Sequence, residues 1–196
     1  MKTRILVTGG TGYIGSHTVV ELQNNGYDVV IVDNLSNSRA EVVDSIEKIT
    51  GVRPAFEKVD CLDMQSLENV FVKYPGIKGI IHFAASKAVG ESVQKPLLYY
   101  RNNLVSLINL LELMPKYNVE GIIFSSSCTV YGQPDVLPVT ESAPIKKAES
   151  PYGNTKQINE EIIRDTVASG APINAIMLRY FNPIGAHPSA LIGELP

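Results

Sequence analysis

The stretch Ile5-Leu6-Val7-Thr8-Gly9-Gly10-Thr11-Gly12-Tyr13-Ile14-Gly15 decides the fold class of this sequence. It joins an apolar run of strand length to an amphipathic stretch, 13–25, that has the period of a helix. Glycines 9, 12 and 15 are spaced in threes, and glycines 10, 12 and 15 also fit the G-x-G-x-x-G pattern. The missing side chains let the backbone approach a pyrophosphate, whose charge is favoured at a helix N-terminus. The stretch predicts a dinucleotide-binding turn around Gly9, Gly12 and Gly15, with a merely tight strand-to-helix turn as the alternative.

The rest of the chain continues the alternation of strand and helix. Further apolar runs, each too short for a helix, occur at 28–33, 55–60, 79–83, 121–125 and 175–179. Longer amphipathic stretches lie between them, at 40–49, 64–73, 97–116 and 152–168. Strands that are apolar on both faces and alternate with helices indicate a parallel sheet covered on both sides. We therefore predict a doubly wound α/β fold with a parallel sheet, the Rossmann fold, in which the proline-containing segment 133–151 is a long surface loop.

Composition argues against several classes of function. The chain has 196 residues, of which 44% are hydrophobic and 19% charged, as expected for one globular core. A net charge of -3, with lysines and arginines scattered along the chain, argues against a nucleic-acid partner. The run Ile5-Leu6-Val7 is too brief for a signal peptide or a membrane span, so neither a targeting segment nor a membrane partner is expected.

Cysteines and histidines give no metal-ligand pattern. Cys61 and Cys128 show no paired spacing, and two cysteines in a chain of this length suggest free thiols in a reducing compartment. This indicates a cytoplasmic protein. The histidines are also scattered, at His17, His82 and His187. We predict no metal site and expect core or solvent-facing histidines.

Acidic residues end two of the expected strands. Asp33 stands where a carboxylate accepts hydrogen bonds from the adenosine ribose hydroxyls, which favours NAD over NADP. The alternatives are a loop-capping role for Asp33 and a contact between Arg39 and a 2′-phosphate. Asp60 ends the next strand and is either a neighbour of the adenine or the cap of the helix that follows.

Two Tyr-x-x-x-Lys pairs occur, and only one has the local structure to act as a pair. Tyr74 and Lys78 are separated by Pro75-Gly76, which breaks a helix and cannot hold both side chains on one face. Tyr152 and Lys156 open the helical stretch that follows a proline, and their spacing puts the phenol and the ammonium side by side.

This second pair suits the oxidation of an alcohol carbon. Removal of hydride requires a base for the hydroxyl proton, and an adjacent ammonium lowers the phenol pKa by favouring phenolate. A serine of Ser125-Ser126-Ser127, at the end of the fifth strand, completes the set by hydrogen bonding the substrate oxygen. Taken alone, Tyr152 would be read as a packing or surface tyrosine, but the cofactor turn, the serine and Lys156 together favour the catalytic role.

These motifs resemble the extended short-chain dehydrogenase/reductase family, and longer stretches resemble its members that invert C4 of a UDP-hexose. The stretches are Val7-Thr8-Gly9-Gly10-Thr11-Gly12-Tyr13-Ile14-Gly15-Ser16-His17, Lys87-Ala88-Val89-Gly90-Glu91-Ser92-Val93-Gln94-Lys95-Pro96 and Leu178-Arg179-Tyr180-Phe181-Asn182-Pro183 with Gly185-Ala186-His187-Pro188. The resemblance covers essentially the whole chain. It implies tightly held NAD, a UDP-sugar substrate that passes through a 4-keto sugar, and a homodimer formed through the helices near 97–116 and 152–168.

The resemblance also implies the site residues. Catalysis would fall to Ser127, Tyr152 and Lys156, and substrate contacts to Lys87, Ser127, Tyr152 and Asn182. Besides the glycine turn, cofactor contacts would come from Tyr13, Ile14, Asp33, Asn34, Asn37, Ser38, Asp60, Cys61, Phe83, Ala84, Lys87, Asn102, Tyr152, Lys156 and Phe181. Cys61 and Ala85-Ser86 depart from the isoleucine and the glycine-leucine pair of the family, and backbone contacts tolerate both changes.

Two other functions remain open at this stage. A nucleotide-sugar 4,6-dehydratase needs an Asp-Glu pair where this chain has Cys128 and Thr129, neither of which supplies a carboxylic acid. A non-catalytic NAD-binding regulator on the same fold would be expected to lose the tyrosine, lysine or serine. We expect residues 1–180 to form the NAD-binding domain and 181–196 to begin a truncated substrate domain, so that the fragment alone has little activity.

Overall fold

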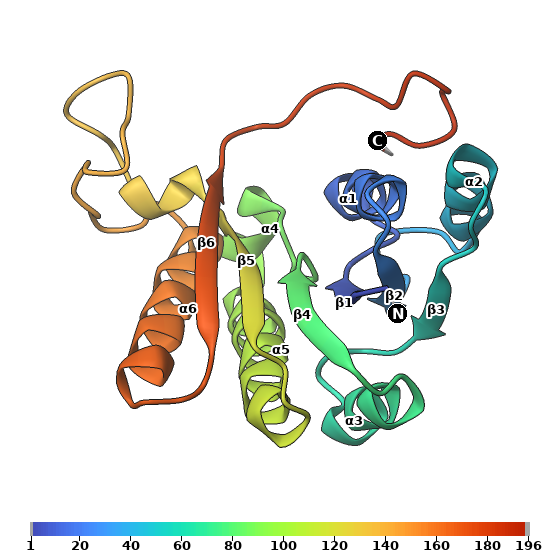
Figure 1. Ribbon diagram of the computed structural model, residues 1–196. Helices are drawn as coiled ribbons and strands as arrows, with labels where there is room; N and C mark the ends of the chain where they lie inside the picture. Colours follow the sequence, from blue (N-terminus) through green and yellow to red (C-terminus); the bar gives the residue numbers. More distant parts are fainter. Residues whose placement is uncertain (1, 195–196) are drawn as a thin grey trace.

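One six-stranded parallel sheet, in the order β3-β2-β1-β4-β5-β6, forms the centre of the molecule (Figure 1). The computed structural model describes residues 2–194. The strands are β1 (Arg4–Thr8), β2 (Asp28–Asp33), β3 (Ala55–Lys58), β4 (Ile77–His82), β5 (Gly121–Ser127) and β6 (Asn174–Tyr180). The helices are α1 (Tyr13–Asn24), α2 (Glu41–Thr50), α3 (Met64–Lys73), α4 (Val89–Gln94), α5 (Pro96–Lys116), the 3-10 helix η1 (Cys128–Tyr131) and α6 (Pro151–Ala168). The predicted doubly wound Rossmann fold is confirmed.

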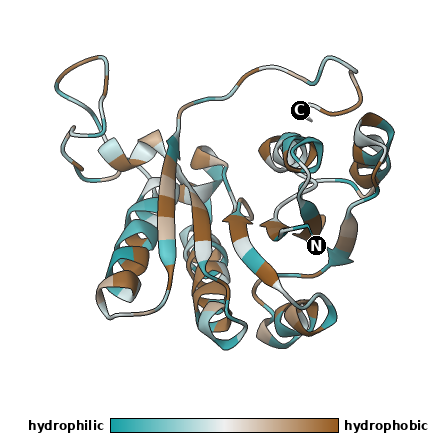
Figure 2. Ribbon diagram, in the orientation of Figure 1, coloured by the Kyte–Doolittle hydropathy of each residue, from teal (hydrophilic) through white to brown (hydrophobic). Residues whose placement is uncertain are grey.

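The sheet is buried through side chains that alternate between its two faces. On β1, Val7 packs with Val19 of α1 and Ile46 of α2, whereas Leu6 packs with Leu107 of α5 and other residues of α3, α5 and α6. Hydrophobic residues accordingly lie along the strands and on the sheet-facing parts of the helices (Figure 2). Because the strand order reverses at β1 and β4, the loops that follow these strands leave a crevice at the carboxyl edge, where ligands bind in such sheets.

Helices α1 and α2 cover only part of their face of the sheet. Ile176 and Leu178 of β6 point to this face and are 57% and 41% exposed. Together with Ile5, Ile123 and other apolar residues of the sheet, Ile176 lines a groove of about 310 Å³. None of the predicted site residues lines this groove, so it is a feature of the sheet face and is separate from the crevice.

Two short elements were not expected. Helix α4 has only six residues and stops at Lys95, directly before the proline that begins α5, so it is too short to show a helical period. The 3-10 helix η1 begins where the Ser127 hydroxyl accepts a hydrogen bond from the amide of Thr129. The remaining elements agree with the predicted ones to within a few residues, and no strand or helix interrupts the expected loop between Gln133 and Ser150.

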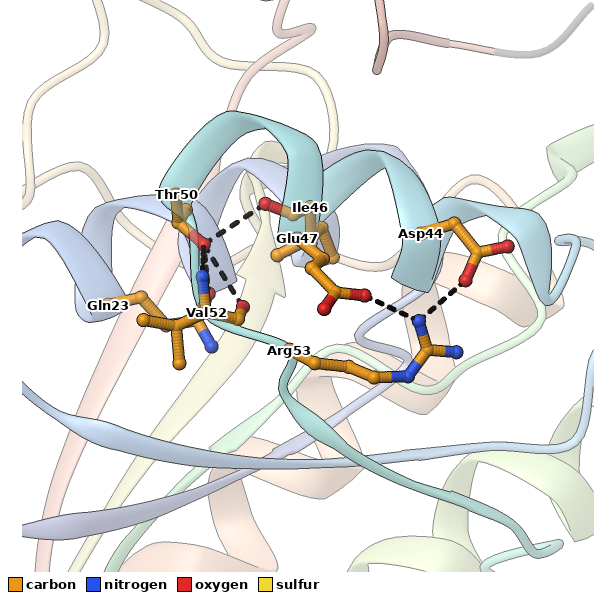
Figure 3. A network of polar contacts seen from close by, with 7 residues as sticks. All are labelled: Gln23, Asp44, Ile46, Glu47, Thr50, Val52 and Arg53. Atoms are coloured by element: carbon orange, nitrogen blue, oxygen red, sulfur yellow. Dashed lines mark hydrogen bonds and ion pairs between the residues drawn. The ribbon is translucent and has the colours of Figure 1, made fainter.

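Hydrogen bonds and ion pairs hold the segment that connects α2 to β3 (Figure 3). Arg53 donates from one guanidinium nitrogen to Asp44 and Glu47 of α2, each at 2.7 Å. The Thr50 hydroxyl at the end of α2 lies 2.8 Å from the Gln23 side-chain oxygen of α1. The Arg53 ion pairs are exposed and therefore contribute little to stability, and their effect is to fix the direction of the chain into β3.

The segment after β6 crosses the carboxyl edge of the sheet and reaches α1 (Figure 1). The Tyr13 hydroxyl donates a 2.6 Å hydrogen bond to the Gly185 carbonyl, and Ile192 is buried in the cluster of α1 and α2. Ala186 and Gly193 form an antiparallel bridge in this segment. Leu195 and Pro196, the last residues of the expected segment 181–196, lie outside the described residues. None of the helices described for residues 2–194 combines the length and hydrophobicity needed to span a bilayer.

Candidate functional site

The turn between β1 and α1 contains two glycines, Gly9 and Gly15, at which a side chain would collide with backbone atoms. Gly9 has φ +69°, and a Cβ on it would lie 2.8 Å from the amide nitrogen of Ala84. A Cβ on Gly15 would overlap the carbonyl oxygen of Gly9. Gly12 occupies the N-cap of α1, and within the described chain no side chain caps this end. The first amides of α1 are therefore available to an anion that approaches along the turn.

Asp33 lies beside this turn and is nearly buried. One of its oxygens accepts from the amide of Thr11 at 3.2 Å, and the other accepts from the Leu35 amide at 2.9 Å and the Ser38 hydroxyl at 3.0 Å. A carboxylate has about four acceptor positions, so Asp33 keeps capacity for a ligand hydroxyl. It also has the loop-capping contacts of the alternative interpretation, while its contact with a ligand remains a prediction. Asn37 lies nearby in the chain but is exposed.

Asp60 and Cys61 follow β3 beside the same crevice. The Asn34 side chain donates to Asp60 at 3.2 Å, which joins the loops after β2 and β3. The helix-cap interpretation of Asp60 is wrong, because Asp63 caps α3 by accepting from the Ser66 amide. Burial raises the pKa of the Cys61 thiol to about 12, and the neighbouring carboxylates of Asp60 and Asp33 add to this shift. Cys61 is therefore a neutral packing group.

The loop after β4 is held by a residue that the sequence did not reveal. The side chain of Asn103 on α5 accepts from the Ser86 amide at 2.8 Å and donates to the Ser86 carbonyl at 3.0 Å. It also donates to the Thr155 hydroxyl on α6 at 3.1 Å. Asn102, a predicted cofactor residue, donates to the Ser86 hydroxyl at 3.1 Å. These contacts fix the backbone that carries Phe83 and Ala84 next to the glycine turn.

Three more of the predicted ligand residues, Lys87, Phe181 and Asn182, are exposed. Lys87 is exposed and forms an ion pair with Glu194 at 3.3 Å. Phe181 and Asn182 follow β6 and are exposed, with Phe181 57% accessible. Direct contact with a ligand remains a prediction for these three residues.

Tyr152 and Lys156 occupy the first turns of α6, as expected. Ser150 caps this helix by accepting from the Gly153 amide at 3.1 Å, and Pro151 is its first residue. Lys156 is buried, and its ammonium nitrogen donates to the carbonyl of Ser125 at 2.7 Å. The same nitrogen lies 5.7 Å from the centre of the Tyr152 ring. Burial lowers the pKa of Lys156 to about 8.

The phenol of Tyr152 has a raised pKa in this structure, with burial as the main cause. Interaction with the Ser127 side chain lowers the value, but it does not outweigh the burial. The expectation that Lys156 lowers the phenol pKa is therefore not met in the protein alone, because the ammonium interacts with a backbone carbonyl and the ring face. Ser127 is the group that favours the phenolate here.

The three consecutive serines at the end of β5 have different partners. The Ser125 carbonyl accepts from Lys156, and the Ser126 hydroxyl donates to Glu160 of α6 at 2.6 Å. Ser127 has extended backbone angles, φ −147° and ψ 151°, so its side chain points away from that of Ser126. Of the three, Ser127 is the one whose side chain lowers the pKa of the Tyr152 phenol.

The histidines do not form a site. His82 is buried at the end of β4, with Nδ1 2.7 Å from the Thr8 hydroxyl, and burial lowers its pKa to about 3. It is a neutral core histidine. His17 and His187 have ring centres 6.4 Å apart, between α1 and the segment after β6. Across residues 2–194 no group of three or more His, Cys, Asp or Glu side chains is placed to hold a metal ion.

Sequence comparison places the chain among known enzymes. It matches the NAD dependent epimerase/dehydratase family over residues 5–194. It is 56% identical over 196 residues to the UDP-glucose 4-epimerase of Schizosaccharomyces pombe, a match that covers 98% of this chain and 55% of that protein. It is 49% identical over 202 residues to the human UDP-glucose 4-epimerase, covering 100% and 58%. The chain thus spans little more than half the length of these relatives.

Solved structures agree with this assignment. UDP-glucose 4-epimerase from Bifidobacterium longum, in complex with NAD+ and UDP, superposes with a TM-score of 0.95 at 49% identity, over 98% of this chain and 57% of that one. The enzyme from Stenotrophomonas maltophila, with NAD and formylated UDP-arabinopyranose, gives a TM-score of 0.95 at 48% identity, over 99% and 57%.

Proposed function

The chain belongs to the NAD dependent epimerase/dehydratase family, and from this premise we propose that it carries the cofactor-binding and catalytic residues for inversion of C4 of a UDP-hexose. UDP-glucose and UDP-galactose are the proposed substrates. The observation that carries the proposal is the arrangement of Ser127, Tyr152 and Lys156 at the carboxyl edge of the sheet, beside a glycine turn built for an anion.

NAD fits the residues of the crevice. The uncapped N-terminus of α1 and the glycine turn suit a pyrophosphate, and the free acceptor capacity of Asp33 suits ribose hydroxyls. When bound, NAD supplies a reversible hydride acceptor. The proposed cofactor residues are Gly9, Gly12, Tyr13, Ile14, Gly15, Asp33, Asn34, Asn37, Ser38, Asp60, Cys61, Phe83, Ala84, Lys87, Asn102, Tyr152, Lys156 and Phe181.

The protein's own residues would move the proton and hold the sugar. The Tyr152 phenolate would take the proton of the C4 hydroxyl, become the neutral phenol and later return the proton, while the Ser127 hydroxyl would hold the same sugar oxygen. Burial of the phenol raises its pKa, so a positive charge brought close by the cofactor would be needed to favour phenolate. Lys156 fixes the end of β5 through the Ser125 carbonyl. Lys87 and Asn182 are proposed substrate contacts.

The residues next to the serine favour inversion over loss of water. Elimination of water from the sugar requires a second acid/base group near the tyrosine. Here Cys128 and Thr129 follow Ser127, and neither carries a carboxylic acid. Retention of the serine, the tyrosine and the buried lysine also argues for an enzyme over an NAD-binding regulator.

Further features of the protein belong to the same proposal. Residues 1–180 would form the cofactor domain and 181–196 would begin a substrate domain, in a cytoplasmic protein. Two copies would pair through α5 and α6, and the exposure of Leu97 (82%) and Ile108 (36%) on α5 supports such an interface.

An assay of C4 inversion tests the function. We expect slow interconversion of UDP-glucose and UDP-galactose with NAD present, and the same assay with their N-acetyl analogues defines the accepted sugars. If prolonged incubation at high protein concentration gives neither interconversion nor reduced cofactor, the proposed function is wrong.

A further inference from the structure

Glu160 of α6 is a fully buried carboxylate with an unusually complete set of donors. Its Oε1 accepts from the Ser126 hydroxyl at 2.6 Å and from Arg179 Nε at 2.9 Å. Its Oε2 accepts from Arg179 Nη2 at 2.7 Å and from Arg164 at 2.6 Å. Burial would raise the pKa of Glu160, but the hydrogen bonds from Arg179 and Ser126 outweigh it and lower the pKa. The carboxylate is therefore ionised and paired, as buried charges must be.

Two of these donors are neighbours across the sheet. Ser126 of β5 and Arg179 of β6 are register partners, and both side chains reach the same carboxylate on α6. The Arg179 guanidinium also lies 4.7 Å from the ring centre of Tyr131 in η1. Glu160 thus joins α6 to the carboxyl ends of β5 and β6, next to the candidate site.

The joined positions are adjacent to the reactive ones. Ser126 lies between Ser125, whose carbonyl accepts from Lys156, and Ser127, whose side chain lowers the pKa of the Tyr152 phenol. Since side chains alternate along a strand, holding Ser126 toward α6 directs Ser127 the opposite way. Glu160 follows Lys156 by one helical turn, so these two residues of α6 form hydrogen bonds with consecutive residues of β5.

We propose that Glu160 is a positioning residue that, through Ser126 and Arg179, holds the end of β5, and with it Ser127, against α6, which carries Tyr152 and Lys156. The inference rests on the proposed function for the role of these two groups in catalysis. Arg164 donates to the same carboxylate, and its side chain is 45% exposed. It provides a matched control.

The test measures the pKa of the Tyr152 phenol by NMR of the full chain labelled with 13C-tyrosine, with Tyr152→Phe to assign the signal. We expect Ser126→Ala to raise the pKa of Tyr152, because the interaction with Ser127 that lowers it is weakened. Glu160→Gln also removes a negative charge, so it is compared by the rate of NAD reduction alone. Arg164→Ala should leave the pKa of Tyr152 unchanged. In parallel, reduction of bound NAD by UDP-galactose should slow about tenfold in Ser126→Ala, as expected for loss of one positioned hydrogen bond, and by no more than twofold in Arg164→Ala.

An unchanged pKa of Tyr152 in Ser126→Ala, with circular dichroism like that of the parent, would overturn the proposal even if Glu160→Gln fails to fold. An equal rise in Arg164→Ala would also overturn it, because the effect would then come from general destabilisation. If the parent chain does not reduce NAD at all, the proposed function fails, and the NMR comparison still decides whether Glu160 positions Ser127.

Discussion

Lys156 shows how burial changes the chemistry of a single residue. A lysine beside a tyrosine would ordinarily be read as the charge that lowers the phenol pKa. Here its ammonium donates to the Ser125 carbonyl, and burial lowers its own pKa from 10.5 to about 8. Burying the ammonium of Lys156 therefore lowers the free energy of unfolding while the lysine is charged, and this effect can be measured from the pH dependence of unfolding.

The stability of the ligand-free chain should depend on the titration of Lys156. Between pH about 8 and 10.5 the folded chain binds fewer protons at Lys156 than the unfolded chain does, so the free energy of unfolding rises with pH across this window. Below pH 8 both states are protonated and this stabilisation is absent. In urea unfolding, Lys156→Met should remove this rise of the free energy of unfolding with pH. Lys78→Met, which replaces an exposed lysine, should retain it. Equal pH profiles for the parent and Lys156→Met would contradict this.

Asp33 should decide between the two dinucleotides. Its carboxylate lies beside the turn and would repel a 2′-phosphate, so calorimetry should give tighter binding of NAD than of NADP. Asp33→Asn should reduce the preference, since it removes the charge but keeps an acceptor. Tighter binding of NADP to the parent chain would overturn the assignment.

Helices and strands could be predicted where a local pattern specifies them. The limits of β2 and α3 match the sequence pattern because each element presents a full hydrophobic period. Helix α4 could not be predicted, because six residues make fewer than two turns. The glycine turn and the Tyr152 pair are likewise local patterns. In contrast, Asn103 hydrogen bonds Ser86, 17 residues away in the sequence, and Glu160 binds Arg179, 19 residues away. These contacts form only in the folded sheet, so no local pattern predicts them.

The turn into α1 should tolerate no side chain at Gly15. A Cβ there would overlap backbone atoms, so Gly15→Ala should lower the free energy of unfolding by about 1–3 kcal/mol. It should also weaken NAD binding, because the turn must open. Gly90 of α4 is the matched control, since a Cβ there meets no atom within 4 Å. Gly90→Ala should raise the free energy of unfolding by about 0.5–1 kcal/mol in urea titrations. Gly15→Ala as stable as the parent would refute the argument.

At the scale of the whole molecule, the part of one sheet face near β6 has no helix over it within residues 2–194 (Figure 1). Parallel sheets are normally covered on both faces, yet β6 exposes Ile176 and Leu178 beside the apolar groove. Exposed apolar patches promote association. This property is independent of the crevice, which lies at the carboxyl edge of the same sheet.

The uncovered face should make the chain self-associate. Sedimentation velocity should show species larger than a monomer that increase with concentration, and Ile176→Glu should reduce them by introducing charge into the patch. Ile145→Glu, in the long loop and 46% exposed, should have no such effect. If both variants sediment like the parent, the association does not use this face.

The most direct test of the proposed chemistry is the rate at which UDP-galactose reduces bound NAD in the parent, Tyr152→Phe and Tyr74→Phe chains. Tyr74 belongs to the second Tyr-x-x-x-Lys pair, lies at the end of α3 and hydrogen bonds Glu57, so its replacement controls for loss of a tyrosine hydroxyl. With Tyr152 as the base, Tyr152→Phe should slow the reduction by about 10²–10⁴-fold while NAD still binds, and Tyr74→Phe should react like the parent. A near-normal rate in Tyr152→Phe would contradict the assignment of Tyr152 as the proton acceptor.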